Sequence, residues 1–135
     1  MQPVVVYDTN VLISGMIWGG VPYRSIELAQ QNKVKGLICD EILDEFEDKL
    51  MIKLGIPSAR TSVLKIRLLG FLQTVEIPNR LKGITTDPDD DMIIECAVVG
   101  GATHIVTGDQ KHLLPLENYQ GILIVKPADF LAQFE

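Results

Sequence analysis

The sequence predicts an α/β fold, a three-layer α/β/α sandwich around a central parallel sheet of about five strands. Short apolar segments alternate with longer amphipathic segments along the chain, and this alternation is typical of strand–helix–strand crossovers, which produce parallel strands. The apolar segments are short and rich in Val and Ile, as in strands that are buried on both faces. The chain has 135 residues, 47% of them hydrophobic, without repeats or a linker, so residues 1–135 are expected to form a single domain.

The first half of the chain is predicted to contain two strands and four helices. Thr9 can cap a helix that breaks at the Gly19-Gly20 pair, and Pro22 suits the first turn of the next helix. Asp40 can cap a third helix. The predicted order is a strand over 4–7, a helix from about 10 to the glycine pair, a helix to about 33, a strand over 36–39, a helix from 40 to about 54 and a helix from 58 to about 72.

The second half is predicted to contain three strands and two helices. The acidic cluster from Asp87 to Asp91 begins a helix, with Asp87 and Asp89 as its caps, and Gly100-Gly101 ends it. The predicted order is a strand over 74–77, this helix through 99, strands over 104–106 and 122–125, and a closing helix over 128–134.

Carboxylates follow two of the predicted strands. Asp8 comes directly after the first strand, and Asp109 follows the strand at 104–106 by three residues. In a parallel sheet, residues just past the strand ends line the crevice where ligands bind. Acids that converge there repel one another unless a cation lies between them. The sequence therefore predicts a divalent-metal site, in which Asn10 could orient the Asp8 carboxylate and the Thr107 hydroxyl could bind a neighbouring one.

Helix periodicity singles out one acid of the 87–91 cluster. Asp90 falls on the same helix face as the apolar residues that pack inward, whereas Asp91 falls about a quarter-turn away, nearer solvent. The apolar residues of this inward stripe are Ile93, Ile94, Ala97 and Val98. We therefore expect Asp90 to be buried beside a partner or a metal ion.

The predicted helix over 40–54 carries five acids, and its pattern does not identify a functional one. Periodicity places Glu41 and Asp48 farthest from the apolar stripe and leaves Glu45 and Glu47 on its two flanks. A solvated acidic face with a Glu45–Lys49 ion pair explains most of these acids equally well.

Composition excludes some classes of protein. Eighteen acidic and twelve basic residues give a net charge of −6, which excludes binding of nucleic acid by general electrostatic attraction but not a nucleic-acid enzyme. Cys39 and Cys96 lack CxxC spacing and are expected to be buried, reduced thiols. We see no signal sequence and no apolar stretch that could span a bilayer, and expect a cytoplasmic protein without membrane contact.

Four segments, in order along nearly the whole chain, resemble the motifs of PIN-domain ribonucleases. They are VYDTNVL at 6–12, EILDE at 41–45, DPDDD at 87–91 followed by Ala97 and Gly101-Ala102, and IVTGD at 105–109. The variant they resemble most is the VapC-like branch, the toxin components of type II toxin–antitoxin pairs. One departure is Cys39, where the family would have Ser before the glutamate helix.

The resemblance implies a PIN-like domain that hydrolyses RNA phosphodiester bonds with Mg²⁺ or Mn²⁺. It implies catalytic roles for Asp8, Glu45, Asp90 and Asp109, and Glu45 depends on the resemblance alone. Asp8 and Asp90 would bind the metal directly, while Asp109 and Glu45 would bind through water or position the nucleophile. The implied partners are an RNA substrate, a cognate antitoxin protein and a second copy in a homodimer.

Two alternatives stay open at this point. The chain could be a catalytically silent PIN-like module that binds RNA or a partner protein. A phosphatase of the haloacid-dehalogenase type with Asp8 as nucleophile is disfavoured, because such enzymes have a second Asp where this chain has Asn10. His104 and His112 are expected to be structural or exposed rather than catalytic.

Overall fold

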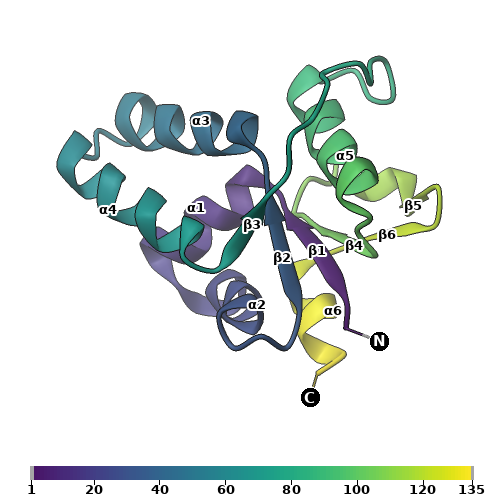
Figure 1. The fold of residues 1–135 in the computed structure, drawn as a ribbon, viewed down its shortest axis with the longest axis horizontal. Coiled ribbons are helices and arrows are strands. Elements are labelled where there is room, and N and C mark those ends of the chain that lie inside the picture. The colour runs from purple at the N-terminus through teal and green to yellow at the C-terminus, as the bar shows by residue number, and fades with distance from the viewer. Residues whose placement is uncertain (1, 135) are drawn as a thin grey trace.

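The structure, a computed structural model, describes residues 2–134. Within this range the chain forms one six-stranded sheet in the order β3-β2-β1-β4-β6-β5, covered by helices (Figure 1). The strands are β1 (Val4–Tyr7), β2 (Lys35–Ile38), β3 (Leu72–Thr74), β4 (His104–Val106), β5 (Asn118–Tyr119) and β6 (Ile122–Val125). All neighbouring strands are parallel except β5 and β6, so the predicted α/β class with a parallel sheet is confirmed.

The sheet contains one strand more than predicted. Gln120 and Gly121 both have positive φ, 50° and 84°, and form the two-residue turn that lets β5 fold back on β6. This conformation suits a tight antiparallel hairpin. A strand of only two residues leaves no periodic pattern in the sequence, which is why it was not predicted.

Strand β3 lies two residues earlier than the predicted 74–77 segment. Its Leu72 is buried and pairs with Gly36 of β2, and the pairing ends at Thr74 opposite Ile38. Gly36 has no side chain, and a Cβ placed there would lie 2.4 Å from the Leu72 Cδ2 atom. Leu72 therefore occupies the space that a side chain at position 36 would need.

The predicted order of the helices is confirmed. They are α1 (Thr9–Trp18), α2 (Gly20–Gln30), α3 (Asp40–Asp48), α4 (Ser58–Leu69), α5 (Pro88–Gly100) and α6 (Pro127–Ala132), with a π-helical turn over Lys49–Lys53 and a 3-10 turn over Leu114–Leu116. The expected caps Thr9 and Asp40 are instead the first helical residues, and Asp8 and Cys39 precede them. Asp87 does cap α5, where its Oδ1 accepts from the Asp89 N–H at 2.9 Å, and Gly101 ends α5 with a φ of 69°.

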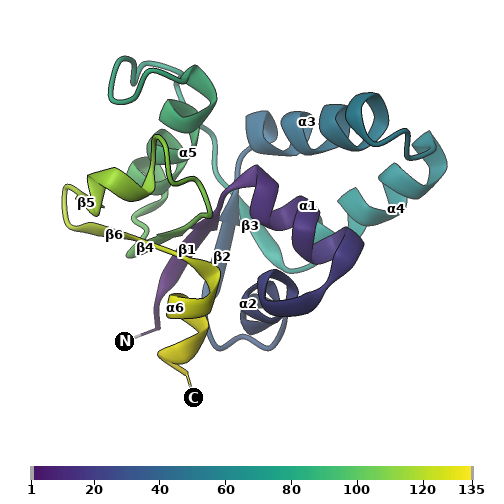
Figure 2. The ribbon, with the colours of Figure 1, turned by 180° about the vertical axis from the view of Figure 1, so that it is seen from behind.

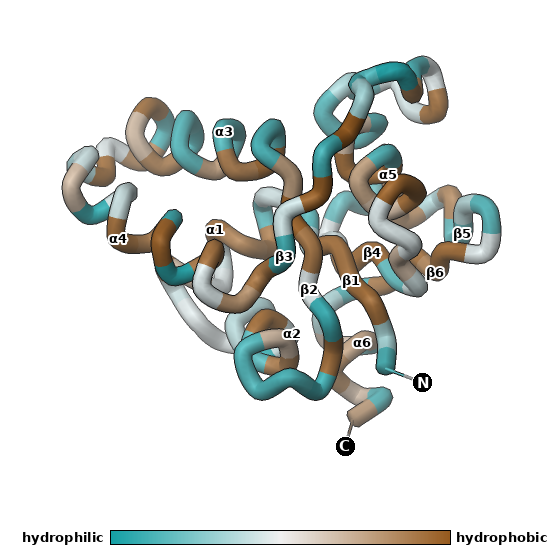
Figure 3. Tube along the Cα trace, viewed as in Figure 1, coloured by the Kyte–Doolittle hydropathy of each residue, from teal (hydrophilic) through white to brown (hydrophobic). Residues whose placement is uncertain are grey.

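Helices cover both faces of the sheet, as Figures 1 and 2 show from opposite sides. Gly36 of β2 faces Ala29 of α2, whereas the next residue, Leu37, contacts Gly100 of α5. Neighbouring residues of a strand point to opposite faces, so α2 and α5 belong to different layers. Helix α5 packs on β1, β2 and β4. In Figure 3 the central strand β1 is largely brown, as expected for a sheet buried between two helical layers.

Both cysteines are buried and free, as predicted. No helix in the described part of the chain is long and apolar enough to cross a membrane.

Candidate active site

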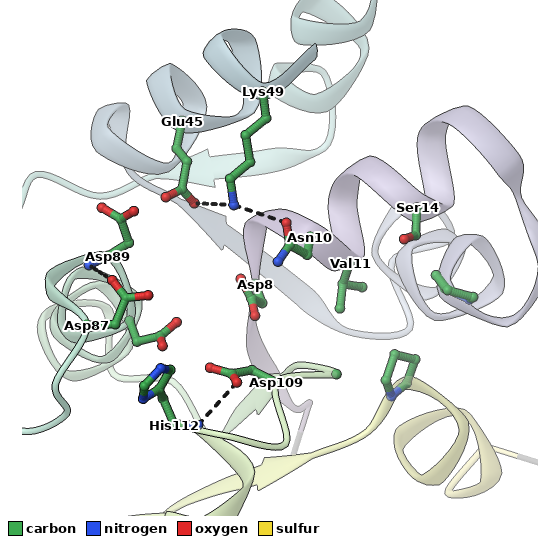
Figure 4. A pocket seen from close by; sticks show the side chains of 14 residues that line it. Asp8, Asn10, Val11, Ser14, Glu45, Lys49, Asp87, Asp89, Asp109 and His112 are labelled. Carbon is green, nitrogen blue, oxygen red and sulfur yellow. Dashed lines mark hydrogen bonds and ion pairs between the residues drawn. The ribbon is translucent and has the colours of Figure 1, made fainter. Parts of the chain in front are cut away.

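A pocket of about 380 Å³ lies where strands β1 and β4 end. The register pairs Tyr7 with Val106, so that the next residues, Asp8 and Thr107, emerge side by side at the edge of the sheet. The polar residues around the pocket come from four parts of the chain that are distant in sequence (Figure 4). They are Asp8, Asn10, Ser14, Glu45, Lys49, Asp87, Asp89, Asp90, Asp109 and His112.

Asp8 is buried at the centre of this group. It occupies the N-cap position of α1, but its side chain makes no capping hydrogen bond and accepts instead from the Thr107 hydroxyl at 2.7 Å. Burial raises the pKa of Asp8, while the hydrogen bond from Thr107, the nearby backbone N–H of Asn10 and the charge of Lys49 oppose this rise. The strand end thus holds a carboxylate where ionisation is costly unless a cation is near.

Thr107 connects two of the predicted acids. Its buried Oγ1 donates to Asp8 Oδ2 and accepts from the Asp109 N–H at 2.9 Å. This is the contact with a neighbouring carboxylate that the sequence predicts for Thr107. The Asn10 side chain differs from its predicted arrangement, since its Oδ1 accepts from Lys49 Nζ at 3.1 Å, and it is the backbone N–H of Asn10 that lies against the Asp8 carboxylate.

Asp90 and Asp109 approach each other from opposite sides of the pocket. Burial, followed by the contact with Asp109, raises the pKa of Asp90 to about 8. Burial alone would raise the pKa of Asp109. Contacts with Asp90 and with the backbone N–H groups of Lys111 and His112 outweigh burial and lower this pKa. The contact between the two carboxyl groups therefore shifts their pKa values in opposite directions, upward for Asp90 and downward for Asp109.

One oxygen of Asp90 has nothing to bind. Asp90 is 7% exposed, and its Oδ2 is buried without a hydrogen-bond partner among the described residues. Buried polar atoms are nearly always hydrogen-bonded, so this oxygen indicates a site completed by something outside the chain. Carboxylate oxygens are the ligands that hard divalent cations prefer, and the residues around Asp90 therefore fit such an ion.

The structure distinguishes the glutamates that the sequence could not. Glu45 of α3 lines the pocket, with a side chain that is 14% exposed and an ion pair to Lys49 at 3.9 Å. Glu41 accepts instead from Asn79 Nδ2 at 2.6 Å, and Glu47 pairs with Lys65. Burial, followed by contact with Asp89, raises the pKa of Glu45 to about 7.

Five polar residues of the pocket lie outside the predicted site. They are Ser14, Lys49, Asp87, Asp89 and His112. Asp87, Asp90 and His112 each offer one ligand atom, and these atoms lie within 4.8 Å of one another. Among the described residues, Asp87, Asp90 and His112 are the group whose ligand atoms lie this close together. The predicted metal-binding residues were Asp8, Asp90 and Asp109, so the two sets have only Asp90 in common. The position of His112, three residues after Asp109 in the same loop, was the available signal.

Two expectations for α5 are wrong. Asp91 was expected nearer solvent but is 4% exposed, because its carboxylate accepts from the N–H groups of Gly83 and Thr85 at 2.9 and 2.7 Å. One turn later the buried Glu95 accepts from Arg80 N–H at 2.9 Å. The segment over 80–85 thus covers the helix face that periodicity assigns to solvent. Val98, expected to face inward, is 38% exposed.

The comparisons with known proteins agree with this fold. Residues 4–111 match the PIN domain family. Among solved structures, the chain is similar to VapBC2 from Rickettsia felis bound to a DNA fragment from their promoter, with 16% identity, a TM-score of 0.63, and 90% of this chain and 96% of that chain covered. No curated protein matches the sequence. Because the family match spans most of the chain, from β1 to the loop after β4, the protein belongs to the PIN-domain family.

Proposed function

We propose that this protein is an endoribonuclease that hydrolyses RNA phosphodiester bonds with Mg²⁺ or Mn²⁺. The observation that carries the proposal is the buried, unpartnered Oδ2 of Asp90 within a pocket lined by acids from separate segments. A divalent ion bound there would activate a water molecule and stabilise the charge that develops on the phosphodiester. Membership of the PIN-domain family supports the same chemistry.

Asp8, Asp90 and Asp109 are the residues that would hold the cation. Asp8 is fixed by Thr107, and Asp109 is fixed by the same hydroxyl and by two backbone N–H groups of its loop. Ligands held in this way lose little freedom when an ion binds. Asp90 must release its proton to bind an ion, so metal binding would increase with pH.

Glu45 and Lys49 would act on the substrate side of the pocket. The pKa of Glu45, near 7, suits a group that accepts and returns protons at neutral pH. Lys49 Nζ lies between Glu45 and Asn10, as Figure 4 shows, and could contact a phosphate oxygen of the RNA backbone. The positive charge of Lys49 would hold an RNA strand at the pocket, although the whole protein carries a net charge of −6.

The biological setting we propose is the cytoplasmic toxin of a toxin–antitoxin pair, active as a homodimer and held inactive by a cognate antitoxin protein. The fold similarity to Rickettsia felis VapBC2 supports this setting. A short open reading frame next to the gene, whose product co-purifies with this chain and abolishes cleavage, is the expected partner. A neighbouring product that leaves cleavage unchanged would contradict this role.

The activity is tested by incubating the purified protein with mixed RNA, with and without Mn²⁺ or Mg²⁺. We expect cleavage that requires the metal and that Asp8→Asn and Asp90→Asn abolish. Asp44→Asn is the matched control, because Asp44 is an exposed acid of α3 outside the pocket. Cleavage without metal, or by the two pocket variants at the wild-type rate, would refute the mechanism. Metal binding without any cleavage would favour the catalytically silent module.

A further inference from the structure

We propose that Asp87, Asp90 and His112 form a second cation site, selective for a first-row transition-metal ion such as Mn²⁺ over Mg²⁺. It would share Asp90 with the site of Asp8 and Asp109. The inference deepens the proposed function and rests on it for the presence of that neighbouring site.

The three side chains come together from two segments. Asp87 and Asp90 lie at the start of α5, and His112 lies in the loop after β4. Their ligand atoms are within 4.8 Å of one another, a span that one ion can bridge. In Figure 4, Asp87 and the His112 ring lie on the same side of the pocket, across from Asn10 and Ser14.

The unsatisfied oxygen of Asp90, which also supports the neighbouring metal site, points to a ligand at this place. The Asp90 side chain lines the pocket, and its Oδ2 is buried and has no hydrogen-bond donor within residues 2–134. Leaving a buried acceptor unsatisfied costs free energy. A cation between Asp90 and His112 would remove that cost.

His112 is held in a way that suits a ligand. Its backbone N–H donates to Asp109 Oδ1 at 3.1 Å, which fixes the loop, and its ring Nδ1 lies 3.2 Å from Thr86 Oγ1. In the tautomer whose Nδ1–H donates to Thr86, the lone pair of Nε2 is free to bind an ion. Histidine ligands commonly donate their second ring nitrogen to an oxygen in this manner. Thr86 directly precedes Asp87 in the sequence. The contact with Thr86 therefore holds the His112 ring next to the Asp87 ligand.

The nitrogen ligand decides the kind of ion. Mg²⁺ prefers oxygen ligands and keeps several of its waters, whereas imidazole favours transition metals. A site made of two carboxylates and one imidazole is therefore expected to take Mn²⁺, Co²⁺ or Zn²⁺ in preference to Mg²⁺. The neighbouring site of Asp8, Asp90 and Asp109 offers only oxygen ligands, so it would not distinguish Mn²⁺ from Mg²⁺ in this way.

The test measures metal binding by the full chain without RNA. Calorimetric titration of the wild type with MnCl₂ is expected to show two sites, and His112→Ala is expected to weaken one of them at least tenfold. Electron spin-echo spectroscopy of bound Mn²⁺ is expected to show ¹⁴N coupling from the imidazole, which His112→Ala removes. His112→Asp should retain the second Mn²⁺ without ¹⁴N coupling and gain affinity for Mg²⁺.

Lys111→Ala is the matched control, because its side chain is exposed in the same loop, and it should leave both sites unchanged. A single Mn²⁺ site in the wild type, or no ¹⁴N coupling, would overturn the inference. The same holds if His112→Ala binds Mn²⁺ like the wild type. RNA cleavage is assayed separately, so metal-dependent cleavage with only one nitrogen-free Mn²⁺ site would keep the proposed function while this inference fails.

Discussion

Thr107 donates its hydroxyl hydrogen to Asp8 Oδ2 over 2.7 Å, although 99 residues separate the two in sequence. The contact exists because β1 and β4 are adjacent and parallel, so that both strands deliver their next residue to the same edge. The same hydroxyl accepts from the Asp109 N–H. One buried side chain therefore holds two of the acids in place.

Replacing Thr107 by Val should lower metal affinity and the cleavage rate by about 10- to 100-fold, because the carboxylates lose the group that orients them. Thr107→Ser keeps the hydroxyl and should retain most of the metal affinity and most of the cleavage rate. Calorimetric Mn²⁺ titration and initial rates of RNA cleavage measure these effects. Equal values for the Val variant and the wild type would show that Thr107 is only a packing residue.

The metal-free protein should become less stable as pH rises from about 4 to 8. The pKa of Asp90 is near 3.8 in the unfolded chain and about 8 in the folded one, so the folded state holds a proton that the unfolded state has already released. This stabilisation is complete below pH 4 and is lost as pH rises through 8. Glu45, with a pKa of about 7, adds to the same trend.

It follows that Asp90→Asn should stabilise the metal-free protein at pH 8. We expect a gain of about 1 kcal/mol, which corresponds to roughly 4 °C in Tm for a domain of this size. Thermal unfolding in EDTA at pH 5 and pH 8 measures this gain in stability, which should be smaller at pH 5. Saturating Mn²⁺ should raise the Tm of the wild type at pH 8 and that of the variant much less. An Asn variant less stable than the wild type at pH 8 would contradict the raised pKa of Asp90.

The sequence predicted those features of the site that depend on local pattern. Asp8 follows a buried strand, and helix phase alone placed Asp90 on the inward face of α5. Features that depend on packing between distant segments were not predictable. Asp91 is buried because the 80–85 segment folds over it, and Glu45 faces the pocket because α3 packs against α1. Periodicity describes one helix and contains no information about what covers it.

Asp91 should matter for stability more than any other acid of its cluster. Its carboxylate binds two backbone N–H groups, and Asp91→Ala would leave both unpaired in a covered segment. We expect a loss of roughly 2–4 kcal/mol in the free energy of unfolding, since hydrogen bonds to charged groups contribute about 1.5–3 kcal/mol each and water recovers a part. Urea unfolding measures the loss, with the exposed Asp44→Ala as control. A loss below 0.5 kcal/mol would mean that the 80–85 segment does not depend on Asp91.

Among the acids of the pocket, Glu45 is the one that the resemblance alone identifies. Glu45 lies in the pocket beside Lys49, while Glu41 and Glu47 are occupied by Asn79 and Lys65. Glu45→Gln keeps the size of the side chain but removes its charge and its capacity to accept a proton.

If Glu45 transfers a proton or positions the nucleophile, Glu45→Gln should lower kcat by about 100-fold or more while KM changes little. Glu41→Gln and Glu47→Gln are the matched controls on the same helix, and both should cleave RNA at nearly the wild-type rate. Single-turnover cleavage with saturating Mn²⁺ separates the chemical step from binding. A strong loss in Glu47→Gln with little loss in Glu45→Gln would transfer the role to the opposite flank of α3, because the two side chains diverge there.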